Sequence, residues 1–163
     1  MIGAVVDAIR RNHALEHATV TLLLARTGPD LRLAGRAVVD GFYIYGRVPT
    51  ELLRECAREA LARLQQGDGG LAITPLCGTN IAVGGVLGGL AAALTLGRRP
   101  TVTRLANACS AVALSLIAAQ PAGRWVQRHL TTCADLATME IAGIRRGLGG
   151  WVHKVETRSS TPA

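Results

Sequence analysis

Hydrophobic and polar positions divide the chain into two kinds of segment. Residues 69–97 contain no charged side chain and have their apolar core at 81–97, and a second uncharged run covers residues 105–123. Each run approaches the roughly 17–25 residues that a helix needs to cross a bilayer. Together they predict a transmembrane helical hairpin over residues 81–123, although a pair of buried helices in a soluble protein would give the same pattern.

The segment before this hairpin has mixed polarity. Residues 2–26 and 50–66 have helical periodicity, with Thr50 as the expected N-cap of the second helix. Residues 36–46 form two short β-type runs around an Asp-Gly pair, which is a hairpin signal. Residues 71–74 add a further short strand.

The segment after the hairpin predicts one more helix and one more strand. Thr131 or Thr132 opens an amphipathic helix that continues to about Arg146, and the spacing of Thr132 and Asp135 resembles a capping box. A membrane hairpin returns both flanking segments to the same side, so we predict an α+β fold with one small helix/strand domain built from both ends of the chain. The expected divisions are 1–80 and 124–157 for this domain, 81–123 for the hairpin, and 158–163 for a loose tail.

Composition favours a membrane protein over a nucleic-acid-binding protein. The chain is 49% hydrophobic but only 3% aromatic, and it contains 19 glycines, as is typical of closely packed membrane helices. The net charge of +7 comes almost wholly from arginine, but the arginines are scattered and no aromatic platform is evident. We therefore expect the lipid bilayer as a partner and no nucleic acid.

The first apolar run contains two overlapping G-x-x-x-G patterns, Gly84/Gly88 and Gly85/Gly89. Glycines at this spacing let helices approach closely, so the run can pack against the second run, against another copy of the chain, or against another membrane protein.

Topology signals oppose one another. Arg98, Arg99 and Arg104 in the connector draw it to the cytoplasm, whereas the arginines of the terminal segments draw those ends there. No secretory signal is recognisable at the N-terminus. We expect a bacterial inner-membrane protein with both termini in the cytoplasm.

The candidate chemistry lies in residues 13–17, which read His-Ala-Leu-Glu-His. On a helix, His13 and His17 stand one turn apart on the same face, so both imidazoles can reach one metal ion. The pattern H-x-x-E-H is the inverted zinc-peptidase signature. It predicts a zinc site with Glu16 as the general base that takes a proton from metal-bound water.

A catalytic zinc needs a third protein ligand and keeps one position for water. We expect Glu140 to be this ligand because it is the only acid in the apolar part of the predicted C-terminal helix. Asp135 is the alternative, but a capping role explains it. The acids of residues 50–66 alternate with arginines and read as a solvated charged stripe: Glu51, Glu55 and Glu59 beside Arg54, Arg58 and Arg63.

Other readings of the same residues remain open. His13 and His17 can be interfacial histidines with Glu16 a surface acid, or ligands of haem or a chlorophyll in a non-catalytic subunit. At the start of the first apolar run, Thr79 or Asn80 can cap the helix; alternatively, Cys77 and Asn80 bind a substrate carbonyl or anion. His129 reads as a membrane-interface residue and His153 as a strand residue. The four cysteines are widely spaced, which argues against a disulfide framework and against a structural zinc knuckle.

Three strings, RNHALEHAT at 11–19, GFYIYG at 41–46 and CGTN at 77–80, resemble a family of small bacterial membrane proteins. That resemblance covers most of the chain, including TTCADLATMEI at 131–141, and implies membrane residence but no activity. HALEH separately resembles the active-site helix of inverted zinc peptidases. We therefore predict an integral membrane zinc hydrolase that acts on peptides; the alternative is a non-catalytic assembly factor or cofactor-binding subunit that packs through its glycine-rich helix.

Overall fold

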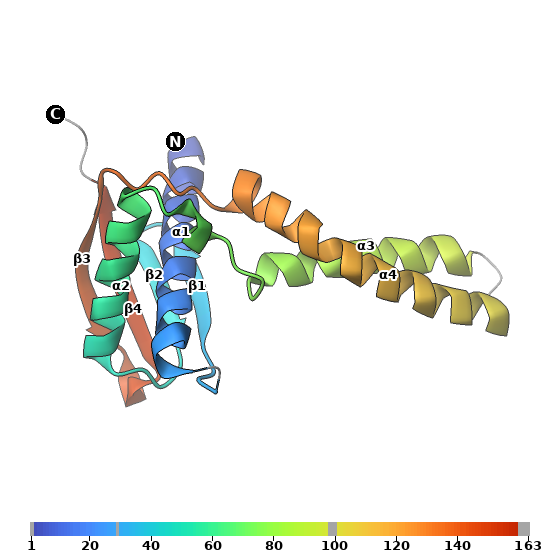
Figure 1. Cartoon of the computed structure of the whole chain (residues 1–163), viewed down its shortest axis with the longest axis horizontal. Helices are drawn as coiled ribbons and strands as arrows, with labels where there is room; N and C mark the ends of the chain where they lie inside the picture. The colour runs from blue at the N-terminus through green and yellow to red at the C-terminus, as the bar shows by residue number, and fades with distance from the viewer. Residues whose placement is uncertain (1, 29, 98–100, 160–163) are drawn as a thin grey trace. The chain divides into compact units, whose positions relative to one another are not determined.

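The computed structural model describes residues 2–28, 30–97 and 101–159 (Figure 1). The chain divides into two compact units: unit 1 comprises Met1–Thr74 and Arg128–Ala163, and unit 2 comprises Pro75–Gln127. Unit 1 contains helices and an antiparallel sheet, and unit 2 is a pair of helices. The predicted α+β class is confirmed.

Unit 1 is a four-stranded antiparallel sheet in the order β1-β2-β4-β3, with helices α1 and α2 on one face (Figure 1). The strands alternate inward and outward side chains, so Phe42, Ile44 and Val155 are fully buried under the helices. The elements of unit 1 are α1 (Ile2–Thr27), β1 (Ala34–Val38), β2 (Gly41–Tyr45), α2 (Thr50–Gln65), η1 (Gly69–Ala72), β3 (Met139–Arg146), η3 (Leu148–Gly150) and β4 (Val152–Ser159).

The β1–β2 hairpin forms where the Asp-Gly pair predicted it. Val38 pairs with Gly41, which leaves a two-residue loop. Gly41 has φ +140°, and a Cβ there would lie 2.0 Å from the carbonyl oxygen of Val155 on β4. Only glycine permits both this backbone conformation and this close approach to the neighbouring strand.

A buried asparagine ties helix α1 to the sheet. The Asn12 amide donates to the carbonyl oxygens of Val38 and Val39 at 2.8 and 3.0 Å. Its own oxygen accepts a bond of 2.6 Å from the hydroxyl of Thr157 on β4. All the polar groups of this side chain are used, so its burial is compensated and the helix is held in one register along β1.

The predicted C-terminal helix is wrong. Residues 139–146 form strand β3, which pairs with β4 and contains an irregularity in register between Ile141 and Gly143. Over so short a length, the apolar side chains of Met139, Ile141 and Ile144 fit both the 3.6-residue repeat of a helix and the two-residue repeat of a strand. The β-branched isoleucines favour the strand. Pairing with β4 therefore decides the conformation, a contact that local sequence does not encode.

Smaller departures occur at the ends of elements. Residues 69–72 form the 3₁₀ helix η1 where a strand was predicted at 71–74. Thr50 is the first residue of α2 and not its cap; its hydroxyl lies 3.1 Å from Nε2 of His153. Strand β4 continues to Ser159, two residues into the predicted tail, of which residues 160–163 lie outside the described residues.

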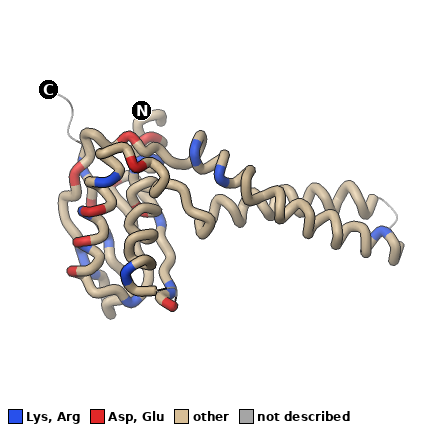
Figure 2. The backbone as a smooth tube through the Cα atoms, in the orientation of Figure 1, with Lys and Arg blue, Asp and Glu red and all other residues tan. Residues whose placement is uncertain are grey.

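Unit 2 consists of α3 (Gly78–Leu96) and α4 (Val102–Val126), packed along each other. Both are long and apolar enough to cross a membrane: mean hydropathy is 1.6 for Gly78–Leu96 and 1.5 for Val102–Thr131, a span that includes the π-helical turn η2 (Gln127–Thr131). Figure 2 shows that the helices carry no charged residue along most of their length. The predicted connector arginines Arg98 and Arg99 lie outside the described residues, and Arg104 is in the first turn of α4.

The two G-x-x-x-G patterns have different environments. Gly84 and Gly88 are buried against α4, where an added Cβ would lie 3.2 Å from Leu116 and 3.5 Å from Val112, respectively. A Cβ on Gly85 or on Gly89 would meet nothing within 4 Å. The first pair therefore packs the hairpin, and association with a further helix remains a prediction for the second pair.

His153 makes the stability of unit 1 depend on pH. Its side chain is fully buried, and its Nδ1 has no hydrogen-bond partner among the described residues. Burial is the main cause that lowers the pKa of His153 below the usual 6.5, and repulsion from Arg146 is the second cause. The unfolded chain thus binds a proton at a higher pH than the folded chain. The stability that depends on neutral His153 is fully present above pH 6.5. It is lost as the pH falls from 6.5 toward the lower pKa of His153 in the folded chain.

We expect the free energy of unfolding to fall as pH is lowered from 7.5 to 5.5, by at most about 1.4 kcal/mol per pH unit from this group. Urea titrations followed by Trp151 fluorescence in a Trp125→Phe background measure it. His153→Gln removes this contribution, whereas His129→Gln retains it. An unchanged pH slope in His153→Gln would contradict the assignment.

Candidate metal centre

His13 and His17 stand together in the middle of α1. Their ring centroids are 4.2 Å apart with an interplanar angle of 62°, and their metal-binding atoms lie within 4.8 Å of each other. This arrangement follows from the i, i+4 spacing on a continuous helix. His17 is only 3% exposed, whereas His13 is half-buried.

Each ring is fixed by a main-chain carbonyl group. Nδ1 of His13 lies 2.9 Å from the carbonyl oxygen of Thr131, and Nδ1 of His17 lies 2.7 Å from that of Ala72. A carbonyl oxygen can only accept, so Nδ1 carries the proton and donates in both cases. In the neutral rings the lone pair is therefore on Nε2, which is the state that binds a metal.

Three further hydrogen bonds hold the chain around Thr131 in place. The guanidinium of Arg10, one turn before His13, donates to the carbonyl oxygens of His129 and Thr132 at 3.1 and 3.3 Å. The amide of Cys133 donates to the carbonyl oxygen of Arg10 at 3.1 Å. The segment 129–133 is thus bound to α1 on both sides of the residue that holds His13.

Glu16 is buried against the sheet. It is 6% exposed, and its carboxylate occupies the space beside Gly35 of β1, where an added Cβ would overlap Oε1 at a separation of 1.9 Å. Glu16 lies about 100° around the helix from His17, so its side chain projects from a different face of α1 than the side chains of His13 and His17. Glycine at position 35 makes room for this carboxylate.

Glu140 is not brought to the histidines. It lies on the edge strand β3, opposite Arg158, and is exposed. Among the described residues of unit 1, no carboxylate or thiolate atom joins the donor atoms of His13 and His17 in a cluster of metal-binding size. The prediction of Glu140 depended on a helix at 131–146; residues 139–146 form a strand instead, and neither Glu140 nor Asp135 joins His13 and His17 in a cluster of metal-binding size.

In unit 2, Cys77 and Asn80 have structural roles. The Cys77 sulfur is the N-cap of α3 and accepts from the amide of Thr79 at 3.4 Å. The Asn80 amide nitrogen donates to the carbonyl oxygen of Pro75 at 2.9 Å, and its oxygen accepts from Gln127 at 3.0 Å. The predicted cap at Thr79 or Asn80 is therefore replaced by Cys77, and a substrate-binding role for Cys77 and Asn80 remains a prediction.

The remaining candidates lie elsewhere. His153 is on β4, as predicted. Cys56 is buried in α2, and burial raises the pKa of its thiol, which makes it a poor nucleophile. All four cysteines are free thiols, consistent with their spacing.

The sequence did not identify the carbonyl groups of Ala72 and Thr131 or the space at Gly35. Main-chain carbonyls leave no residue-type signal, since every residue has one. Gly35 could have been noticed as a glycine within a strand pattern, which indicates a close approach of some other group.

These features define a class of protein: an α+β domain, assembled from both ends of the chain, with a two-histidine helix and an inserted pair of apolar helices. The chain belongs to the family described as a domain of unknown function, DUF6391, whose model matches residues 8–144. It is similar to an uncharacterised protein of Picosynechococcus sp. (strain ATCC 27264 / PCC 7002 / PR-6), with 38% identity over 141 residues, 78% of this chain and 67% of that protein. No solved structure matches. The functional argument therefore depends on the site itself.

We expect Gly35→Ala to displace the Glu16 carboxylate and to lower the free energy of unfolding by about 1–3 kcal/mol, the usual effect of overpacking. Because Glu16→Ala removes the overlapping atoms, the cost of Gly35→Ala should be smaller in that background. Thermal unfolding of the four proteins of this double-mutant cycle measures the coupling.

Gly143→Ala is the matched control on the same sheet, since a Cβ there would make only an ordinary contact of 3.8 Å with Glu156. Equal costs for Gly35→Ala with and without Glu16 would show that Glu16 does not occupy this space.

Proposed function

We propose that this protein is an integral membrane metallohydrolase that acts on peptides, with zinc held by His13 and His17 and with Glu16 as the general base. The main support is the pair of Nδ1–carbonyl bonds at 2.9 and 2.7 Å. They place the lone pairs of two adjacent rings on Nε2. A histidine that binds a metal through one ring nitrogen usually donates a hydrogen bond from the other ring nitrogen.

The donor set fits zinc in part. Two neutral imidazoles one helical turn apart are a common half of a zinc site, and a catalytic zinc takes three protein ligands.

Bound zinc would lower the pKa of a coordinated water. The part of Glu16 in this chemistry is to accept the proton of that water and transfer it to the leaving group. Glu16 suits the role of general base because its carboxylate is not one of the metal-binding groups and lies next to His17 in the sequence. The burial of Glu16 against Gly35 restricts the position of its carboxylate.

Location in the bacterial inner membrane, with both termini in the cytoplasm, is part of the proposal. The two apolar helices support membrane insertion. Their outward surfaces carry large apolar side chains, such as Leu94 and Ile117, which are 84% and 71% exposed. Such surfaces suit lipid better than water.

Metal content tests the site. We expect protein purified in detergent without added metal to contain one zinc per chain, and His13→Ala and His17→Ala to lose it, by elemental analysis. His129→Ala is the matched control and should retain the metal. Glu140→Gln should also retain the metal, because Glu140 lies exposed on β3. Full zinc occupancy in both His13→Ala and His17→Ala would refute the site.

Hydrolysis separates an enzyme from a cofactor-binding protein. We expect the zinc-loaded protein to cleave a mixture of quenched fluorescent peptides, and Glu16→Gln to keep its zinc while losing a factor of about 10²–10⁴ in rate, as for loss of a general base. If Glu16→Gln leaves the rate unchanged, Glu16 is not the base. If the zinc-loaded wild type cleaves nothing, the non-catalytic alternative, a cofactor-binding subunit or assembly factor, is favoured.

A further inference from the structure

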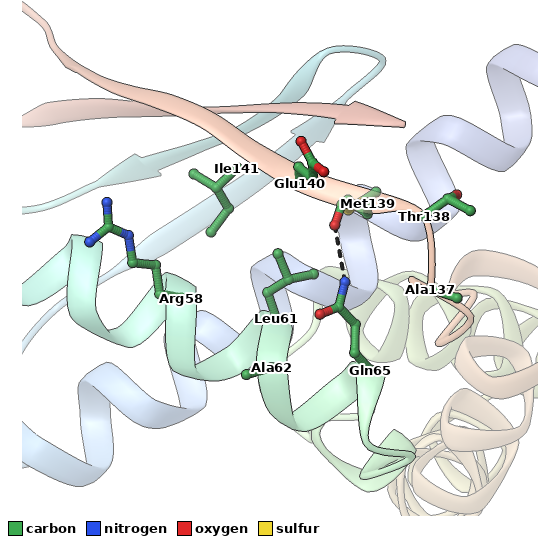
Figure 3. A pocket seen from close by; sticks show the side chains of 9 residues that line it. All are labelled: Arg58, Leu61, Ala62, Gln65, Ala137, Thr138, Met139, Glu140 and Ile141. Atoms are coloured by element: carbon green, nitrogen blue, oxygen red, sulfur yellow. Dashed lines mark hydrogen bonds between the residues drawn. The ribbon is translucent and has the colours of Figure 1, made fainter. Parts of the chain in front are cut away.

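A second feature of unit 1 is a groove between α2 and the first half of β3 (Figure 3). Its volume is 380 Å³, within the range of ligand sites. One wall is the face of α2 that carries Leu61 and Ala62, and the other is the chain at 137–141. The groove contains neither histidine of the candidate metal centre, so it is independent of the proposed function.

Strand β3 is the last strand of the sheet among the described residues, and β4 is its neighbour on one side only. Gln65 of α2 donates to the carbonyl oxygens of Leu136 and Met139 at 3.1 and 3.0 Å. The carbonyl of Met139 therefore faces α2 and not β4. Main-chain groups alternate in direction along a strand, so those of Ile141 also point away from β4, to the open edge of the sheet beside the groove.

This edge can accept a short additional strand. An extended peptide that adds to an edge gains main-chain hydrogen bonds, and side-chain pockets beside the edge give it specificity. The change of register between Ile141 and Gly143 interrupts the regular strand and confines such pairing to the part that borders the groove. Glu140 also borders the groove, and Figure 3 shows its side chain pointing away from α2.

Arg58 gives the groove its charge. Helix α2 has other arginines that are paired with acids: Arg54 with Glu51, and Arg63 with Asp68. The acid that could pair with Arg58 one turn back, Glu55, instead binds Arg26 of α1.

Among the residues that the structure describes, Arg58 forms no ion pair, and it lines one end of the groove (Figure 3). The groove thus combines a strand edge, an apolar wall and an arginine without an acidic partner. We propose that it binds an extended peptide segment whose carboxylate pairs with Arg58. The main chain of the segment pairs with β3 at Ile141, its apolar side chains contact Leu61 and Ala62, and its acidic group reaches the guanidinium, a charge-assisted bond.

The test uses the full chain in detergent micelles and three fluorescein-labelled peptides with amidated C-termini. The first is Thr-Val-Thr-Val-Thr-Asp. The second has Asn in place of Asp, which removes the only carboxylate of the peptide part while the label stays the same. The third repeats the first with N-methylated valines, which removes two main-chain donors. Fluorescence anisotropy gives the dissociation constants. We expect the second peptide to bind at least 5-fold more weakly than the first, and the third at least 10-fold more weakly.

Arg58→Gln should reduce binding of the Asp peptide to the level of the Asn peptide. Arg54→Gln is the matched control on the same helix and should leave all three constants unchanged. The proposal is overturned if no peptide binds saturably up to millimolar concentration, if the Asp and Asn peptides bind equally, if N-methylation has no effect, or if Arg58→Gln and Arg54→Gln behave alike.

Discussion

Two hydrogen bonds from histidine side chains to main-chain carbonyls hold the candidate site together. His17 binds the carbonyl oxygen of Ala72 and His13 that of Thr131. Ala72 lies shortly before the inserted pair of apolar helices in the sequence, and Thr131 shortly after it. The histidines therefore bind both chain segments that flank the insertion, the one that precedes it and the one that follows it. Each bond adds only about 0.5–1.5 kcal/mol to stability, but together they select the tautomer and orientation on which metal binding depends.

The insertion explains how unit 1 is built. A hairpin of two helices returns the chain near to its starting point, so residues 128–159 can complete a sheet begun by residues 34–45. Strand β4 takes the central place beside β2, and β3 is added at the edge. The central position of β4 buries Val155 and His153, and the edge position of β3 leaves Glu140 in solvent.

Charge placement on α2 links the two helices of unit 1 to the groove. Glu55 and Glu59 bind Arg26 of α1, which ties the end of α1 to α2 at the surface. These exposed pairs contribute little energy individually. They matter for position, because they engage Glu55 and Glu59, the acids closest to Arg58 in the sequence of α2, while Arg58 lines the groove beside β3. The predicted charged stripe thus contains one arginine in a different environment from the rest.

The sequence determined the local features of this protein. The i, i+4 spacing of His13 and His17, the Asp-Gly turn before Phe42 and the two uncharged runs each depend on residues close together in the chain, so pattern alone located them. The tertiary structure decided the rest. Residues 139–146 became a strand through pairing with β4, which places Glu140 on an exposed edge, and carbonyl groups 55 and 118 residues from their histidines fixed the rings. The physical reason is that strand pairing and main-chain acceptors are available to almost any residue, and only the folded chain selects which of them meet.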